Sequence, residues 1–308
     1  MLNIETIEND LKTLGIESGD TLLLRISYRA VGKIDGSVNS LIEALLHVVG
    51  SEGTIVAMAF PMPTGSVLFK PFYRLKPIKY GCINIGTGAV PSVMAKRNDA
   101  FLSTNILFPY VAIGKNAQKI CENHTEKSGP YDLIKNIAYN YNAKILRIGG
   151  NVLNGTTHIA FSEALRRRNA YQKRYGIGNY YLINQNIVWK QVNVSMFCYE
   201  QYASFSARYL AGCELGRGRV GNGDAVLNNL RDILAIEERL ITPNPEILLC
   251  SNPYCWKCRL SYSYSNSNLL KFFFVVTIGI IKRKISAKYG ISILKSAFKN
   301  IIFGIKAQ

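Results

Sequence analysis

Three cysteines near residue 250 have the spacing of a metal-binding motif. Cys250, Cys255 and Cys258 form a C-x4-C-x2-C pattern, and thiolates spaced in this way can share a zinc ion. A structural zinc site uses four ligands, but the local sequence offers no fourth ligand and Cys213 lies far away along the chain. We therefore predict free thiols and no metal site, with a shared zinc ion as the alternative.

Five basic residues in the second half of the chain are candidates for binding phosphate. They are Arg166, Arg167, Arg168, Lys173 and Arg174. Guanidinium groups bind phosphate through charge-assisted hydrogen bonds, but such a run of charges is also typical of the solvent-facing side of a helix. The sequence leaves both interpretations open.

The chain has only three histidines, the side chains that most often serve as general bases near neutral pH. His47 falls inside a helix predicted over residues 37–49, and we expect a structural role for it. His124 falls in a polar segment, and we expect a surface loop residue. His158 precedes a helix predicted over residues 159–168 and is the best candidate for catalysis, with a partly exposed loop histidine as the alternative.

The positive charge of the chain is large and unevenly distributed. The formal net charge is +17. Residues 1–60 carry 4 basic and 8 acidic side chains, whereas residues 261–308 carry 8 basic and no acidic ones. This charge implies an anionic partner such as a nucleotide, a phosphorylated cofactor, a membrane surface or a nucleic acid. Because no nucleic-acid-binding motif is recognisable, nucleic acid remains a distant alternative and we predict none as a partner.

The last 48 residues have an amphipathic pattern. At 100° per residue, Lys284, Lys288, Lys295, Lys299 and Lys306 fall within about 60° of one another. The broader opposite side carries apolar residues, namely Ile293, Leu294, Ala297, Phe298, Ile301 and Ile305. This pattern is typical of a helix at a membrane interface, although Gly290 and Gly304 weaken it, and a helix docked on the body is the alternative. We predict a domain over residues 1–260 and a basic tail over residues 261–308 that contacts the membrane peripherally.

Hydrophobic spacing predicts the elements that must position these residues. A helix over residues 4–14, a strand over 21–24, the helix over 37–49 and a strand over 54–60 make a βαβ-type start. Residues 61–90 follow as a long surface excursion. Later elements are a short helix over 90–96, strands over 144–149, 180–182, 187–189 and 192–196, and a helix over 224–239. The predicted fold class is α/β, a mixed central sheet with flanking helices.

Two features favour a cytoplasmic protein. The first residues do not have the composition of a signal or transit peptide, and the seven cysteines form no paired framework. No run reaches the roughly 18 apolar residues of a membrane span.

Four segments together resemble the aminoglycoside 3-N-acetyltransferase family, over roughly residues 4–250. The first segment contains residues 19–24, Ser27, Gly32 and residues 34–36. The second contains Gly50, Gly53-Thr54 and Phe60-Pro61. The third contains Thr87-Gly88, Ser103 and residues 112–117, and the fourth contains residues 145–149, Thr156-Thr157 and Glu163.

The resemblance implies a reaction and a set of site residues. Members of this family move an acetyl group from acetyl-coenzyme A to an amine of an amino sugar. The implied catalytic residues are His158 and Glu163, with the glutamate orienting the histidine. The implied cofactor contacts are Arg25, Ser27, Tyr28, Ser103, Thr104, Ala112 and Gly114.

The chain departs from the family's pattern where histidines are expected. After the first strand the family usually has His-Ser-Ser, whereas this chain has Arg25-Ile26-Ser27. The histidine of the third segment corresponds to Asn105, and that of the fourth corresponds to Ala160 in an ungapped alignment. Neither side chain can act as a general base. If His158 lay on the same helix as Ala160, it would be rotated from Ala160 by about 200° and would face away from the site. If it lay in the loop before the helix, it could still reach the site.

The sequence therefore predicts an acetyl-coenzyme A-dependent N-acetyltransferase of a divergent kind. The acceptor is an amino sugar, either an aminoglycoside, as in antibiotic resistance, or a nucleotide-linked amino sugar, as in polysaccharide biosynthesis. The positive charge favours the nucleotide-linked sugar, which is anionic. The alternative is a catalytically impaired relative that binds the cofactor or a glycan precursor, or acts as a scaffold. The sequence allows an oligomer and does not specify one.

Overall fold

The computed structural model describes residues 2–59, 65–66, 78–79, 87–105, 108–150, 156–157, 159–160, 163–164, 177–183, 186–191, 199–255 and 269–303. The chain forms two compact units. The first consists of residues 1–62, 78–153 and 209–235, and the second of residues 63–77, 154–208 and 236–308.

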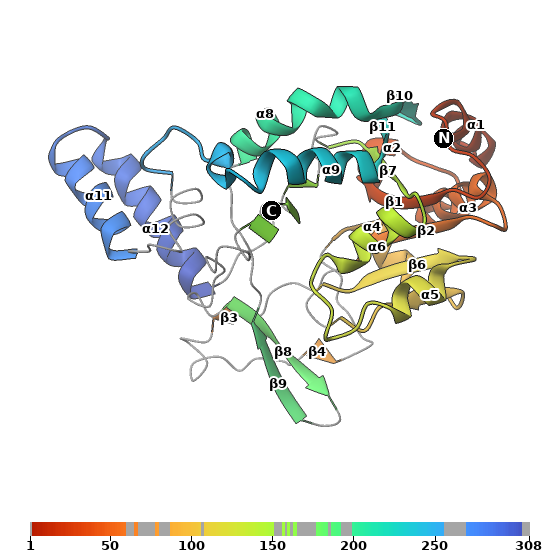
Figure 1. Ribbon diagram of the computed structural model, residues 1–308, viewed down its shortest axis with the longest axis horizontal. Helices are drawn as coiled ribbons and strands as arrows, with labels where there is room; N and C mark the ends of the chain where they lie inside the picture. Colours follow the sequence, from red (N-terminus) through yellow and green to blue (C-terminus); the bar gives the residue numbers. More distant parts are fainter. Residues whose placement is uncertain are drawn as a thin grey trace. The chain divides into compact units, whose positions relative to one another are not determined.

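A seven-stranded mixed sheet forms the centre of the first unit (Figure 1), in the order β10-β11-β7-β1-β2-β6-β5. The strands are β1 Thr21–Ile26, β2 Thr54–Met58, β5 Ala100–Leu102, β6 Tyr110–Gly114, β7 Lys144–Ile148, β10 Glu214–Val220 and β11 Gly223–Asn229. Strand β1 is parallel to both β2 and β7, and each outer pair is antiparallel. The predicted mixed sheet with flanking helices is confirmed.

The central strand β1 begins with an uninterrupted run of buried residues. Residues Thr21 to Leu24 are all buried, which is the pattern of a parallel strand covered on both faces. Leu22 and Leu24 join the main core cluster. Since side chains alternate along a strand, Leu23 and Arg25 point to the opposite face.

Helices α1 (Ile4–Thr13) and α3 (Ser37–Val49) cover the face that carries the main core cluster, together with α4 (Ala89–Met94). Ile7 and Leu11 of α1 are fully buried. The Asn3 side chain caps α1 by accepting from the Thr6 amide at 2.7 Å. Both predicted helices near the N-terminus are thus confirmed. Helices α5 (Ala117–Glu122) and α6 (Asp132–Asn140) follow β6, and α5 packs against β5 and β6.

The second unit contains a small sheet and several helices. Strand β8 (Ile177–Ile183) pairs antiparallel with β9 (Asn186–Gln191) and with β3 (Gly65–Ser66), so the strands predicted around residues 181 and 188 are confirmed. Its last elements are α11 (Leu269–Ile281) and α12 (Ala287–Phe303). The other elements of the described residues are β4 Ile78–Lys79, the short helix α2 Tyr28–Val31, the 12-residue helix α8 Tyr199–Leu210, and the 3-10 turns Ala211–Cys213 and Pro245–Leu248. The strand predicted over 192–196 and the boundary near residue 261 lie outside the described residues.

The helix predicted over residues 224–239 is wrong in its first part. Residues Gly223–Asn229 form strand β11, and helix α9 covers only Leu230–Ile241. Strand β11 pairs with β7 on one side and with β10 on the other. These pairings with neighbouring strands override a local apolar spacing that continues without a break into the helix.

Two adjacent glycines after β7 allow a test of the packing between β7 and the turn after β1. Gly149 and Gly150 have φ angles of +68° and +62°. A Cβ on Gly149 would lie 2.2 Å from the Cβ of Ala30, whereas no described heavy atom lies within 4 Å of the corresponding position on Gly150.

We expect Gly150→Ala to lower the free energy of unfolding by about 1–2 kcal/mol through its backbone conformation alone. Gly149→Ala should cost about 1–3 kcal/mol more, because the backbone must also shift. Urea unfolding of both variants measures the difference. Equal losses would contradict the close approach of β7 to the turn at Ala30.

Candidate active site

The carboxyl ends of β1, β2 and β7 lie at one edge of the sheet, because these strands are parallel. Strand β5 runs in the same direction as β2, since both are antiparallel to β6. The residues that follow these four strands therefore gather at this edge: Ser27-Tyr28, Thr87-Gly88 through the contact described below, Ser103 to Asn105, and Gly149-Gly150. We call it the carboxyl edge. Ligands of open α/β sheets bind outside such an edge.

The turn after β1 is held against β7. The Ser27 amide donates to the Ile148 carbonyl at 2.9 Å, and Tyr28 begins the short helix α2. Ser27 is exposed, whereas Arg25 and Tyr28 are half-buried. The structure thus brings three of the predicted cofactor contacts together at the end of one strand.

Thr87 returns the chain to the end of β2 after the excursion. Its hydroxyl donates to the Met58 carbonyl at the last position of that strand. This contact places Thr87 and Gly88 near Ser27, as expected for neighbouring parallel strands.

Two arginine side chains lie on one face of the sheet near its carboxyl edge. Arg25 and Arg147 are register partners in β1 and β7, so both point to the same face. Arg147 is 2% exposed and donates to the Asn228 side chain on β11. Burial raises the pKa of the Tyr110 phenol, and the charge of Arg25 opposes this shift in part. Sequence reasoning missed Arg147, and its signal was an arginine inside an apolar strand.

Ser103 is fixed by contacts with β6 and with His124. Its hydroxyl oxygen accepts from the Tyr110 amide at 2.9 Å and lies 3.1 Å from Nδ1 of His124. The other ring nitrogen of His124 lies 3.0 Å from the Gly129 carbonyl. His124 is only 1% exposed, so its prediction as a surface loop residue is wrong. One partner, Gly129, lies in the same loop, whereas Ser103 is 21 residues away along the chain and leaves no local signal.

These contacts define the tautomer of His124. A carbonyl can only accept a hydrogen bond, so Nε2 carries the proton that is donated to Gly129. Burial lowers the pKa of the imidazole, although the Gly129 carbonyl and the charge of Asp132 oppose this shift. The ring is therefore neutral, and Nδ1 accepts from the Ser103 hydroxyl. His124 is a structural group whose two nitrogens are engaged.

Asn105 stands where the resemblance places a histidine. Its side chain forms hydrogen bonds with the loop that carries His124. Its amide nitrogen donates to the carbonyls of Thr125 and Ser128 at 3.0 and 3.1 Å. Its amide oxygen accepts from the Phe108 amide at 3.0 Å. Asn105 thus joins the strand-ending segment to the loop after α5, whereas its neighbour Thr104 is exposed.

In the second unit, a buried carboxylate holds the segment that precedes His158. Glu237 of α9 is fully buried. It accepts from the amide of Thr156 at 3.0 Å and from its hydroxyl at 2.6 Å, and from the Thr157 hydroxyl at 3.0 Å. Sequence reasoning missed this role of Glu237. Described helical residues begin at Thr157; Ala160 is buried and Glu163 is half-buried. His158 itself lies outside the described residues, as do Arg166 to Arg168.

Ala112 and Gly114 are not brought together with Ser27 and Ser103. Ala112 is fully buried in the middle of β6. Gly114 pairs with Thr54 at the start of β2, about 13 Å from Tyr110 along the strand. Its φ is +119°, and an added Cβ would lie 2.3 Å from the Gly53 carbonyl oxygen. Close backbone approach is a sufficient reason for this glycine.

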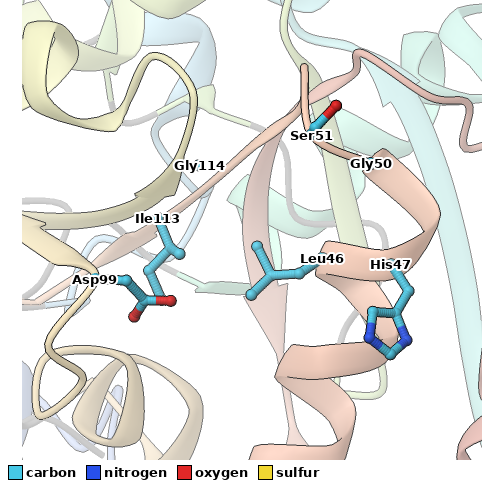
Figure 2. A pocket seen from close by; sticks show the side chains of 7 residues that line it. All are labelled: Leu46, His47, Gly50, Ser51, Asp99, Ile113 and Gly114. Atoms are coloured by element: carbon cyan, nitrogen blue, oxygen red, sulfur yellow. The ribbon is translucent and has the colours of Figure 1, made fainter.

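Gly114 lines a shallow hollow of about 490 Å³ at the end of the sheet away from the carboxyl edge. Figure 2 shows its lining residues, which are Leu46, His47, Gly50, Ser51, Asp99, Ile113 and Gly114. Asp99 is ion-paired with Arg97 at 2.7 Å, which lowers the pKa of its carboxyl. The exposed ring of His47 lies 2.7 Å from Glu8. None of its lining residues is a lysine or an arginine, so the lining offers no side chain of the kind that usually binds phosphate.

Among the described residues, no group of three or more histidine, cysteine or acidic side chains is arranged to hold a metal ion. Cys250 and Cys255 form no disulfide bond among the described residues, and Cys258 lies outside the described part of the chain.

Solved structures of aminoglycoside acetyltransferases and of a related protein resemble this chain in fold. Three solved aminoglycoside acetyltransferase-like structures share the fold. YokD of Bacillus subtilis has a TM-score of 0.68 and 22% identity, covering 80% of this chain and 95% of YokD. AAC-IIIb, solved with coenzyme A, has a TM-score of 0.63 and 18% identity, covering 78% and 96%. A histidine-to-alanine mutant of AAC(3)-IVa, in complex with a gentamicin, has a TM-score of 0.66 and 21% identity, covering 85% and 97%.

Sequence comparison gives the family. The model of the aminoglycoside 3-N-acetyltransferase family matches residues 23–242. The YokD sequence, described as an aminoglycoside N(3')-acetyltransferase-like protein, is 24% identical over 265 residues, which is 78% of this chain and 92% of YokD. The chain belongs to the aminoglycoside 3-N-acetyltransferase family, as the four segments predicted.

The burial of His124 generates a pH prediction. In the unfolded chain this histidine binds a proton below about pH 6.5, whereas the folded state resists protonation. Stability should therefore fall as the pH drops below that value. We expect His124→Gln to cost about 1–3 kcal/mol at pH 7 and the gap from the wild type to narrow towards pH 5. Urea unfolding at several pH values measures the gap.

The control for this experiment is His47→Gln, because the His47 side chain is 59% exposed. This variant should retain the acid sensitivity of the wild type. A gap for His124→Gln that stays constant or widens on acidification would contradict the neutral, buried imidazole.

Proposed function

We propose that this chain is an acetyl-coenzyme A-dependent N-acetyltransferase that acts on an amino group of an amino sugar. The observation that carries the proposal is the family match over residues 23–242, with the sheet and its carboxyl edge intact. One solved member of the fold holds coenzyme A and another holds a gentamicin. Those ligands belong to the relatives, and we extend their chemistry to this chain.

The carboxyl edge supplies groups that fit the cofactor. Acetyl-coenzyme A provides the acetyl group as a thioester. Exposed hydroxyls at Ser27 and Thr104 can donate to its polar atoms, and the Arg25 guanidinium suits its phosphates. Ser103 contributes by fixing the loop that presents Thr104. We leave Ala112 and Gly114 out of the contact set and assign them to the architecture of β6.

The acceptor amine needs a base, because it is mostly protonated at neutral pH and cannot then attack a carbonyl carbon. We assign the base to His158 and its orientation to Glu163. Asn105 has no basic nitrogen, and both ring nitrogens of His124 are engaged. The ammonium form first loses a proton to solvent, and the neutral amine attacks the thioester carbonyl carbon. His158 takes the second proton from the nitrogen as the amide forms, and the histidine returns that proton to the departing thiolate.

The charge of the protein favours an anionic acceptor. An aminoglycoside is a polycation, which a chain of net charge +17 repels, whereas a nucleotide-linked amino sugar is attracted. We therefore propose the nucleotide-linked class as the preferred acceptor. A second candidate function is cofactor binding without turnover. It is favoured by Asn105, whose amide ties two loops together at the expected position of a histidine.

Arg25 should contribute to binding of coenzyme A. We expect Arg25→Gln to weaken binding by about tenfold or more, since a hydrogen bond to a charged group contributes about 1.5–3 kcal/mol. The matched control is Lys115→Gln, which makes the same charge change next to Gly114, on an exposed residue paired with Glu52. Isothermal titration at low salt measures both. Absence of binding up to millimolar coenzyme A would contradict the proposal, and equal weakening by both variants would contradict the assigned site.

Turnover should depend on His158. We expect His158→Ala to lower the rate by roughly 10²–10⁴-fold, the usual contribution of a general base. The measurement is thiol release from acetyl-coenzyme A against a panel of amino sugars, with and without a nucleotide, alongside His47→Ala as the control. Full activity of His158→Ala would overturn the assignment. Binding of coenzyme A with no thiol release by the wild type for any acceptor would favour the second candidate.

A further inference from the structure

We propose that the helical hairpin formed by α11 and α12, residues 269–303, docks on a membrane surface that contains anionic lipid. The hairpin lies outside the family match, which ends at residue 242. It is therefore an addition to the acetyltransferase framework, and its surface calls for a separate explanation.

The hairpin has a small core of its own, and the two helices lie side by side in Figure 1. Phe272 and Val276 of α11 pack against Ile293 of α12. Gly290, which weakened the amphipathic pattern in the sequence, is buried where the helices meet. A Cβ there would lie 2.4 Å from the side chain of Ile280. The hairpin thus uses only part of its apolar surface internally.

Several large apolar side chains of the hairpin are exposed. Phe274 is 66% exposed and Ile281 is 70% exposed. They lie seven residues apart, about two helical turns, and so share one face of α11. Tyr289 and Ile291 at the start of α12 are about half exposed. Four large exposed apolar residues in one small element, two of which share a face of α11, mark an interaction surface.

Positive charge borders this surface. Lys282, Arg283 and Lys284 form the connection between the helices and are all exposed, as are Lys288 and Lys295. The sequence from residue 247 to residue 308 contains no aspartate or glutamate. A surface of exposed apolar and aromatic side chains beside unopposed cations is complementary to anionic lipid headgroups over acyl chains.

The dimensions require the hairpin to lie on a bilayer instead of crossing it. Helices of 13 and 17 residues are about 20 and 26 Å long at 1.5 Å per residue, shorter than a hydrocarbon core of about 30 Å. In the part of the chain that the structure describes, no helix is both long and apolar enough to cross a membrane. Phe274 and Ile281 would therefore insert shallowly while the lysines contact headgroups.

The test is co-sedimentation of the full chain with phosphatidylcholine vesicles that contain or lack phosphatidylserine. We expect binding only with phosphatidylserine, weaker at higher salt because the attraction is screened. Two variants should each reduce it by tenfold or more: Lys282→Glu with Arg283→Glu, and Phe274→Ser with Ile281→Ser. The control, Lys115→Glu with Lys119→Glu, changes exposed lysines of the first unit and should retain binding.

A second readout locates the contact. Tryptophan placed by Phe274→Trp should be quenched by brominated lipid relative to the wild type. Tryptophan placed by Phe101→Trp, at a 40% exposed phenylalanine of the first unit, should not be quenched.

Four results would overturn the proposal. The first is binding of neither vesicle type, and the second is equal quenching at the two tryptophans. The third is lipid-free self-association that the apolar variant abolishes, which would make a second copy the occupant. The fourth is salt-sensitive binding to DNA or RNA that competes with the vesicles and is lost in the charge variant.

Discussion

The arrangement of residues at the carboxyl edge of the sheet depends on one constraint, which is that β1 lies between two parallel neighbours. Because β1 pairs in parallel with β2 and with β7, the residues after all three strands emerge at one edge. Ser27, Gly149 and the returning Thr87 are neighbours for this reason, although more than a hundred residues separate the first from the second. The same register sets Arg25 beside the buried Arg147 and brings cationic character to this end of an apolar sheet. At the opposite end of the sheet, close packing of the backbone explains why residue 114 is a glycine.

Buried polar groups replace the expected histidines as the features that define the local structure. Asn105 ties its segment to the loop after α5 through two hydrogen bonds of its amide nitrogen, and His124 ties the same loop to Ser103. In the second unit, Glu237 gathers two threonines at the start of the helical residues that lead to Glu163. Each is the sort of group that is costly to bury unless its partners are all present, so each fixes one loop conformation. A divergent family member can in this way keep well-defined loop conformations while its candidate catalytic residues differ from those that the family usually has.

The sequence predicted those parts of the fold that depend on local patterns. The apolar run at residues 21–24 and the helical spacing of Ile7 and Leu11 sufficed for β1 and α1. Strand β11 was predicted as helix because Ala225, Val226 and Leu227 continue smoothly into the pattern of α9, and only pairing with β7 decides between the two. Strand β10 carries glycines and arginines and lacks an apolar alternation. The family resemblance predicted cofactor contacts near Ser27, but not the buried position of His124, whose contact with Ser103 is set by tertiary structure.

The central claim is that the carboxyl edge of the seven-stranded sheet is the cofactor site. Hydrogen–deuterium exchange with and without coenzyme A tests it most directly, because the method reports on the backbone of each segment separately. The account predicts slower exchange on binding at the turn after β1, at Gly88 with the first residues of α4, and at Thr104 with Asn105, and no change around Gly114. Protection centred on the hollow at Gly114, with the turn after β1 unaffected, would contradict it.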